Sequence, residues 1–185
     1  MKKNFLYIIL ALICVSAGPL LAAESWQDLN AKVTSLYQQG QYAQALPWAK
    51  QSLTTAESNF GAASPETALA LNNLAMIYKK QENYTQAEML YTRALNISEK
   101  LVGPSHPDIT VPLNNLALLY AAQKEYGKAF ETSDRALTIL ENVYGPNHAN
   151  VATALEKYAA IKRQAGKAKD AETFEKRAAQ IRGSK

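Results

Sequence analysis

The chain has 185 residues, a formal net charge of +4, 48% hydrophobic and 19% charged residues, and a single cysteine. These values fit one domain or a short repeat array, and they exclude collagen-like, disulfide-rich and low-complexity classes. The low charge and the many apolar residues argue against wholesale disorder. A sustained apolar run occurs only near the start of the chain, which excludes a polytopic membrane protein.

The first residues have the order of a secretory signal peptide. Two lysines precede an apolar run over residues 5–15, a glycine–proline pair then breaks any helix, and small residues precede Glu24. We therefore expect residues 1–23 to be cleaved and the protein to be exported, to a bacterial periplasm or to the medium. The alternative is an uncleaved N-terminal anchor, which the short, proline-broken run disfavours. Cleavage would remove Cys14, and with it any disulfide or thiolate chemistry.

The rest of the chain repeats itself every 42 residues. Residues 64–105 and 106–147 are identical at 17 of 42 positions without a gap, and the motif Leu-Asn-Asn-Leu-Ala-x-x-Tyr at Leu71 returns at Leu113. Weaker matches extend this period in both directions, so we expect four units. They are residues 24–63, 64–105, 106–147 and 148–185. The outer two are degenerate, as expected for end caps that face water.

The pattern of apolar residues in each unit predicts two antiparallel helices. An i, i+3, i+4, i+7 apolar stripe begins at Leu71 and ends at Tyr78. Gly103 suits a left-handed cap after one helix, and Pro107 suits the first turn of the next. Pro112 predicts a kink or a late start in its helix. The predicted helices are 26–39, 42–59, 65–81, 84–101, 107–123, 126–143, 149–165 and 168–182.

This pattern resembles the tetratricopeptide repeat. The signature positions of that family are matched, in order, by Leu74, Ala75, Tyr78, Tyr84, Ala87, Tyr91 and Ala94. The 42-residue period, the Asn-Asn-Leu-Ala core and the Gly-x-x-His-Pro linker resemble the kinesin-light-chain subtype. The resemblance implies an all-α, right-handed α-solenoid of helical hairpins. It also implies that the first helix of each hairpin lines a concave groove for peptides or protein segments.

An asparagine recurs at one position on the groove side of these first helices, as Asn30, Asn72 and Asn114. Asparagine is unfavourable inside a helix, so a column of three needs a reason. One hypothesis is a ladder of carboxamides that bind an extended peptide backbone, which resembles the asparagine clamp of peptide-binding repeats. The alternative is that the amides satisfy inter-repeat turns or face water. Asn73 and Asn115, one position further on, are expected to bond the neighbouring repeat.

Basic residues share the predicted groove side. Lys79, Lys80 and Arg163 would suit an acidic segment or a terminal carboxylate, and the alternative is that they serve solubility. Charge is also uneven along the chain, since residues 24–150 carry 9 basic and 12 acidic groups and residues 151–185 carry 9 and 4. The basic last repeat would suit an anionic membrane or cell-wall surface, with a solvated end cap as the alternative. The basic cluster lacks interleaved aromatic residues, so no nucleic-acid partner is expected.

The two histidines occupy equivalent positions. His106 and His148 each stand one residue before a predicted helix, where the first linker has Ser64. A position that accepts serine or histidine is typical of helix capping, and we expect neither a metal nor a catalytic role there. Catalytic and phosphate-binding motifs are missing from the sequence, so no cofactor and no enzymatic activity are expected.

The leading functional hypothesis is an exported, non-enzymatic adaptor that binds a peptide or protein segment in its groove. The alternative is a structural scaffold that associates through its edges or convex face, including with itself. An enzyme is the third and least supported class. The oligomeric state, the pathway and the partner's identity do not follow from the sequence.

Overall fold

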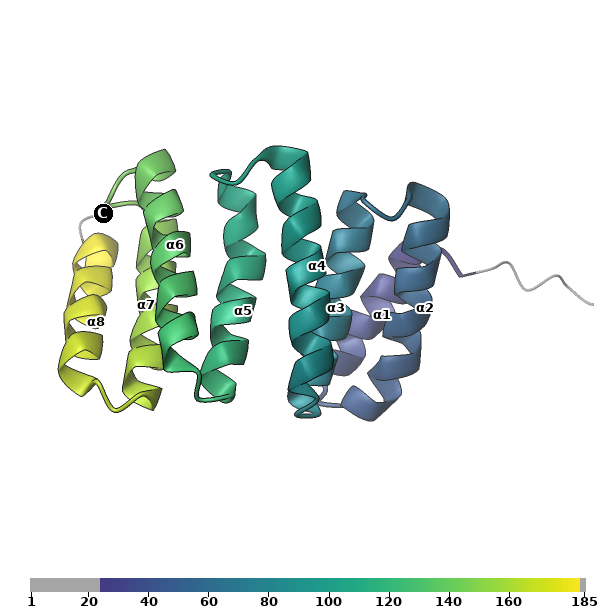
Figure 1. The fold of residues 1–185 in the computed structure, drawn as a ribbon, viewed down its shortest axis with the longest axis horizontal. Helices are drawn as coiled ribbons and strands as arrows, with labels where there is room; N and C mark the ends of the chain where they lie inside the picture. Colours follow the sequence, from purple (N-terminus) through teal and green to yellow (C-terminus); the bar gives the residue numbers. More distant parts are fainter. Residues whose placement is uncertain (1–23, 184–185) are drawn as a thin grey trace, which may run out of the picture.

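The computed structural model of the protein describes residues 24–183, and there the chain is a row of antiparallel helices (Figure 1). The predicted signal peptide, residues 1–23, lies outside the described residues. The helices are α1 (Trp26–Gln38), α2 (Tyr42–Phe60), α3 (Pro65–Lys80), α4 (Tyr84–Val102), the short 3₁₀-helix η1 (Pro107–Ile109), α5 (Thr110–Ala122), α6 (Tyr126–Tyr144), α7 (Ala149–Gln164) and α8 (Ala168–Gly183). The described part contains no strand, and none of its helices is long and apolar enough to cross a bilayer.

Consecutive helices form four hairpins, α1/α2, α3/α4, α5/α6 and α7/α8, that stack into a solenoid (Figure 1). We call the first helix of each hairpin helix A and the second helix B. The turns within hairpins lie along the lower edge of Figure 1, and the connections between hairpins lie along its upper edge. All predicted helices are present, and apart from the one at 107–123 each end agrees within one residue.

The helix predicted at 107–123 starts late. Its first turn is η1, and α5 begins only at Thr110. The Thr110 hydroxyl donates to the carbonyl of Pro107 at 2.7 Å, which closes this tight turn. Pro112 is then the third residue of α5, where a missing N–H costs no helical hydrogen bond. The proline is therefore accommodated by the late start, and the alternative prediction of a kink is not needed.

The glycines that end the B helices differ from the expected left-handed cap. Gly103 has φ 94° and ψ 157°, and Gly61 and Gly145 are nearly the same. This extended region at positive φ is open to glycine almost alone. The expectation of a positive φ was correct, but that of a left-handed helical conformation was wrong, because the chain leaves each B helix extended toward the next helix A.

Alanine columns allow the helices to pack closely. The buried alanines of helices A are Ala75, Ala117 and Ala159, and those of helices B are Ala45, Ala87, Ala129 and Ala171. Each is at most 1% exposed. Such close packing is expected where small side chains stand at helix crossings. Larger residues fill the space between units, and Tyr91 of α4 is completely buried.

Two lysines replace apolar residues of the repeat pattern, and each packs on aromatic rings. Lys32 places its Nζ 3.2 Å from the centroid of the Trp48 ring. Lys162 places its Nζ 3.9 Å from the Phe130 ring centroid and 4.9 Å from that of Tyr158. The aliphatic stem fills the apolar site while the ammonium group interacts with the ring face. The end repeats thus keep their packing despite these lysines.

An arginine latch connects successive hairpins. Arg93, Arg135 and Arg177 stand one period apart on helices B. Each places Nη2 within 2.6 Å of a glutamate on the preceding helix B, and also donates to a carbonyl of the connection that follows that helix. The glutamates are Glu57, Glu99 and Glu141. This latch fixes each hairpin against the one before it.

Candidate functional site

One face of each helix A is left uncovered by its neighbours. On α3 the side chains on this face that are not fully buried are Leu69, Asn72, Asn73, Met76, Lys79 and Lys80. Their spacing of three or four residues places them on one side of the helix. Residues one period away occupy the same positions on α1, α5 and α7. We call this surface the groove face.

The asparagines of the groove face form hydrogen bonds between adjacent helices A. Asn73 donates through Nδ2 to Oδ1 of Asn30 at 2.7 Å, and Asn115 donates in the same way to Asn72 at 2.7 Å. The prediction that Asn73 and Asn115 bond the neighbouring repeat is confirmed. Their acceptors are two of the three proposed clamp residues, so the amide oxygens of Asn30 and Asn72 already have partners within the protein.

The amide groups still have hydrogen-bonding capacity toward a ligand. Asn72 directs Nδ2 only at the sulfur of Met76, 3.6 Å away, and a thioether is a weak acceptor. The side chain of Asn114 makes no hydrogen bond within the described residues, because Lys157 stands where a third donor asparagine would be. The clamp hypothesis therefore stays a prediction, with amide N–H groups, more than carbonyls, as the available contacts.

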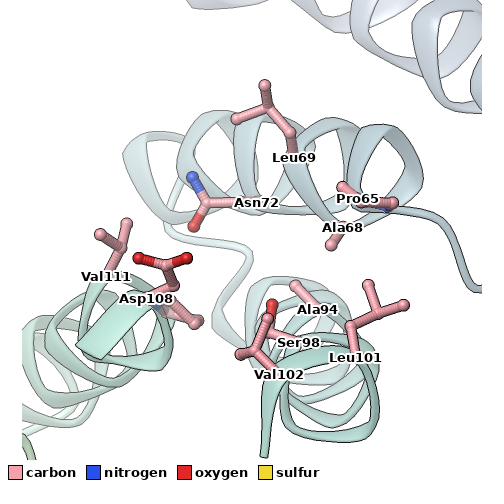
Figure 2. Close-up of a pocket in the computed structure, with 11 residues that line it drawn as sticks. Pro65, Ala68, Leu69, Asn72, Ala94, Ser98, Leu101, Val102, Asp108 and Val111 are labelled. Carbon is pink, nitrogen blue, oxygen red and sulfur yellow. The ribbon is translucent and has the colours of Figure 1, made fainter. Parts of the chain in front are cut away.

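Asn72 borders a cavity between α3, the C-terminal end of α4 and the η1–α5 segment (Figure 2). We call it the repeat-2 cavity; its volume is about 300 Å³. Its lining is mostly apolar: Pro65, Ala68, Leu69, Ala94, Leu101, Val102, Val111 and Pro112, with Asn72, Ser98 and Asp108 as the polar members. Leu69 is 44% exposed and Val111 is 59% exposed, so the apolar walls continue onto the surface.

The same cavity recurs one hairpin later. The repeat-3 cavity, of about 280 Å³, is lined by Val111, Asn114 and Tyr144 where the repeat-2 cavity has Leu69, Asn72 and Val102. Asp108 and Val111 line both cavities and form the ridge between them. The second cavity is more polar, since it also includes Asn150, Thr153 and Lys157. Asn72 and Asn114 thus occupy equivalent places in two neighbouring cavities.

The predicted basic residues lie at another level of the groove face. Lys79 is seven residues beyond Asn72 on α3, which a rise of ~1.5 Å per residue converts to ~10 Å along the helix. Burial, and secondarily the charge of Lys80, hold the pKa of Lys79 below its usual value. Lys80 lies over the Tyr42 ring at 5.9 Å from Nζ to centroid. The three asparagines therefore lie at one level of successive helices A, and these lysines lie at another level of α3.

Arg163 and much of the basic last repeat are paired within the protein. Arg163 makes a bidentate contact with Glu175, at 2.7 and 2.6 Å. Glu156, which takes the asparagine position on α7, pairs with Arg182 at 2.7 and 2.9 Å. Further pairs join Lys162 to Asp170, Lys176 to Glu172 and Arg177 to Glu141. Much of the excess positive charge of residues 151–185 is therefore matched locally, and a surface contact through this segment stays a prediction.

The two histidines cap helices, as predicted. Nδ1 of His106 accepts the backbone N–H of Asp108 at 3.2 Å, and Nδ1 of His148 accepts that of Asn150 at 3.1 Å. Ser64 plays the same part for α3 through its hydroxyl, 3.1 Å from the N–H of Thr67. In the part of the chain that the structure describes, no group of three or more potential metal ligands comes together.

The sequence reasoning missed Leu69, Val111 and Asp108. Leu69 and Val111 are apolar residues that lie outside the packing stripe that begins at Leu71. An apolar residue outside that stripe could have indicated an exposed apolar surface on helix A. Asp108 gave no such signal, because its place depends on η1 and on the end of α4, which lies in the preceding hairpin.

Comparisons with known proteins agree with this geometry. The tetratricopeptide repeat family matches residues 29–100, 66–132 and 108–184. A search among curated proteins finds no significant match. Solved structures that resemble the fold include BtubC (BKLC) from P. vanneervenii, with a TM-score of 0.75, 25% identity, and coverage of 86% of this chain and 63% of that chain. This chain thus spans less than two thirds of that protein's chain.

A second similar structure is a putative kinesin light chain with nearly identical TPR-like repeats from Podosopora anserina. It has a TM-score of 0.71 and 16% identity, over 86% of this chain and 75% of that chain. A variant of that protein with one substituted residue gives a TM-score of 0.74. At this identity the likeness supports the fold alone. Together with the family match over most of its length, the stacked hairpins establish that the chain belongs to the tetratricopeptide repeat family.

Proposed function

We propose that the protein is an exported, non-enzymatic adaptor whose groove face binds a peptide or protein segment. Repeats of this family generally bind proteins or peptides, and the groove face supplies a place for such a segment. The observation that carries the proposal is the recurrence of one cavity in two successive hairpins, with Asn72 and Asn114 in equivalent positions. An extended segment would meet an asparagine amide at equivalent places in two successive cavities, first beside a mostly apolar wall and then beside a more polar one.

The two levels of the groove face give the proposal a more definite form. A segment that crosses the helices at the level of Asn72 and Asn114 would fill the cavities. An acidic side chain or carboxylate would have to reach ~10 Å further along α3 to meet Lys79 and Lys80. The half-buried Lys79 has no carboxylate partner within the described residues, which favours an acidic contact there as a secondary feature.

Site-specific photo-crosslinking in the native compartment tests this proposal. A photoreactive amino acid in place of Asn114 should give adducts with partner proteins, and the same amino acid in place of Met89 is the control. Met89 is 57% exposed on helix α4 and lines none of the cavities described above. Substituting Val111→Ser should weaken the adducts at position 114. Equal adduct yields from positions 89 and 114 would contradict groove binding.

The same experiment separates the scaffold alternative. If the photoreactive residue at position 89 gives crosslinked dimers of the chain without an added partner, self-association through helices B is favoured. Export has its own test: mass spectrometry of the protein from the extracytoplasmic fraction should show a start at residue 23 or 24. An intact N-terminus that stays with the membrane would instead favour an anchor.

A further inference from the structure

We propose that the repeat-2 cavity receives an apolar side chain of the partner segment, and that the Asp108 carboxylate at its rim selects a lysine or arginine beside that side chain. This inference rests on the proposed function and adds the chemistry of the partner at one site. It differs from the expectation of an acidic partner, which came from lysines at another level of the groove face.

The cavity has the size and lining for one large apolar side chain. Its volume of about 300 Å³ is at the small end of the range for ligand sites, so it suits a side chain better than a cofactor. Figure 2 shows Leu69 on α3, Val111 on the neighbouring η1–α5 segment, and Leu101 and Val102 on α4 opposite α3. All four are exposed by 41–59%. Covering such neighbouring apolar surfaces is the main gain when a segment binds.

The carboxylate of Asp108 pairs with no lysine or arginine in the described residues. Among these residues it is the only charged group that lines this cavity, and its side chain is 74% exposed. Its nearest basic group is His106, with Nδ1 3.5 Å away. That nitrogen also accepts the backbone N–H of Asp108. In the described residues no lysine or arginine forms an ion pair with Asp108, so its exposed carboxylate is open to a cation of the partner.

The repeat-2 and repeat-3 cavities differ in chemistry, so the groove face changes from one hairpin to the next. Beyond Asp108 and Val111 the lining becomes polar, and Lys157 is the charged residue at its far side. A bound segment would therefore meet an apolar wall, then a carboxylate, then polar groups and a lysine. Charge complementarity of this kind affects partner choice more than overall affinity. The order of chemistry suits a segment in which an apolar residue and a basic one stand side by side.

Binding of short synthetic peptides tests the inference. The probes are fluorescently labelled, capped peptides of Gly and Ser with a central pair of residues. The first of the pair is Trp, Leu or Ala, and the second is Arg, Gln or Glu, in every combination. Fluorescence anisotropy with the full chain should show the Trp-Arg and Leu-Arg peptides bound best. We expect arginine to be preferred over glutamate by about tenfold at low salt, and the preference to shrink at about 0.5 M salt.

Variants assign the effect to its residues. Asp108→Asn should bring the arginine-to-glutamate ratio close to one and leave the preference for Trp or Leu over Ala unchanged. Leu69→Ser should remove the apolar preference. Glu131→Gln removes an exposed carboxylate on α6 that does not line this cavity, and it should change neither. Circular dichroism should show the same helix content for all variants.

The outcomes separate this inference from the proposed function. Peptides that bind in a Leu69-dependent way but prefer glutamate, or keep the arginine preference in Asp108→Asn, would overturn the role of Asp108 and leave groove binding intact. Binding unaffected by Leu69→Ser would overturn the cavity as the apolar site. Failure of every peptide to bind at millimolar concentration would overturn both proposals.

Discussion

The arginine latch should carry measurable energy between hairpins, and Arg135→Ala is the substitution that tests it. Arg135 contacts Glu99 of the preceding helix B at 2.5 Å and the carbonyl of Pro104 at 3.2 Å. The side chains are 41% and 25% exposed, so solvent screens the ion pair to about 0.5–1 kcal/mol. The carbonyl hydrogen bond adds about 0.5–1 kcal/mol. Arg135→Ala should therefore lower the free energy of unfolding by about 1–2 kcal/mol.

Urea unfolding followed by circular dichroism measures this effect. A double-mutant cycle of Arg135→Ala with Glu99→Ala should give a coupling energy of about 0.5–1 kcal/mol, reduced at high salt. Since the latch couples neighbouring repeats, its loss should also broaden the unfolding transition. The control cycle is Lys128→Ala with Glu125→Ala, which removes an exposed pair within one hairpin. That pair should affect the transition's midpoint only slightly and its width not at all.

Two results would refute this reasoning. Additive effects of Arg135→Ala and Glu99→Ala would mean that the ion pair contributes nothing to stability. A coupling energy as large for the Lys128 pair would mean that the latch has no special role between hairpins.

Three further predictions concern the stability of the fold. Tyr91→Phe should raise the free energy of unfolding by about 1 kcal/mol, because it removes a buried hydroxyl that lacks a partner within the described residues; chemical denaturation checks this. Burial raises the pKa of Tyr91, so the fold keeps this group neutral. The free energy of unfolding should be constant below pH ~10 and decrease at higher pH, because Tyr91 then ionises in the unfolded chain. Thermal melts at several pH values should show a smaller decrease for Tyr91→Phe. Lys124, with φ 63°, stands where Gly40 and Gly166 occur in the end hairpins. Lys124→Gly should therefore be neutral or stabilising by up to about 1 kcal/mol, whereas Lys124→Ala, the control, should not stabilise.

Local features of this fold could be predicted from the sequence because each depends on neighbouring residues. The apolar stripe that begins at Leu71 identified the helices, and Pro107 and Ser64 marked where helices begin. The capping role of His106 followed from its register with Ser64. Even the bonding of Asn73 and Asn115 to a neighbouring repeat was predicted, since the 42-residue repeat fixes which residues face a neighbour. The structure adds that the neighbour is the preceding hairpin.

Features that depend on how one hairpin packs on the next could not be predicted in the same way. The conformation of Gly103 follows from the direction in which the chain must leave α4 to reach η1. The repeat-2 cavity depends on the distance between the ends of α3, α4 and η1, which no local pattern encodes. The separation of Lys79 from Asn72 along α3 is different, because the rise of the helix is enough to predict it. The two residues share the groove face, as predicted, but stand two turns apart on it.

The columns of the array indicate how it could recognise a partner. The packing columns keep one residue type from hairpin to hairpin, as Ala87, Ala129 and Ala171 do, because every interface must have the same shape. The groove column that contains Leu69 instead changes to Val111 and then to Thr153. This column contributes little to packing, so its members are free to differ. A segment bound in reverse would place its apolar side chain near Thr153 and Lys157, where the lining is more polar. Under the proposed function, the order of side chains along the partner is therefore what the groove distinguishes.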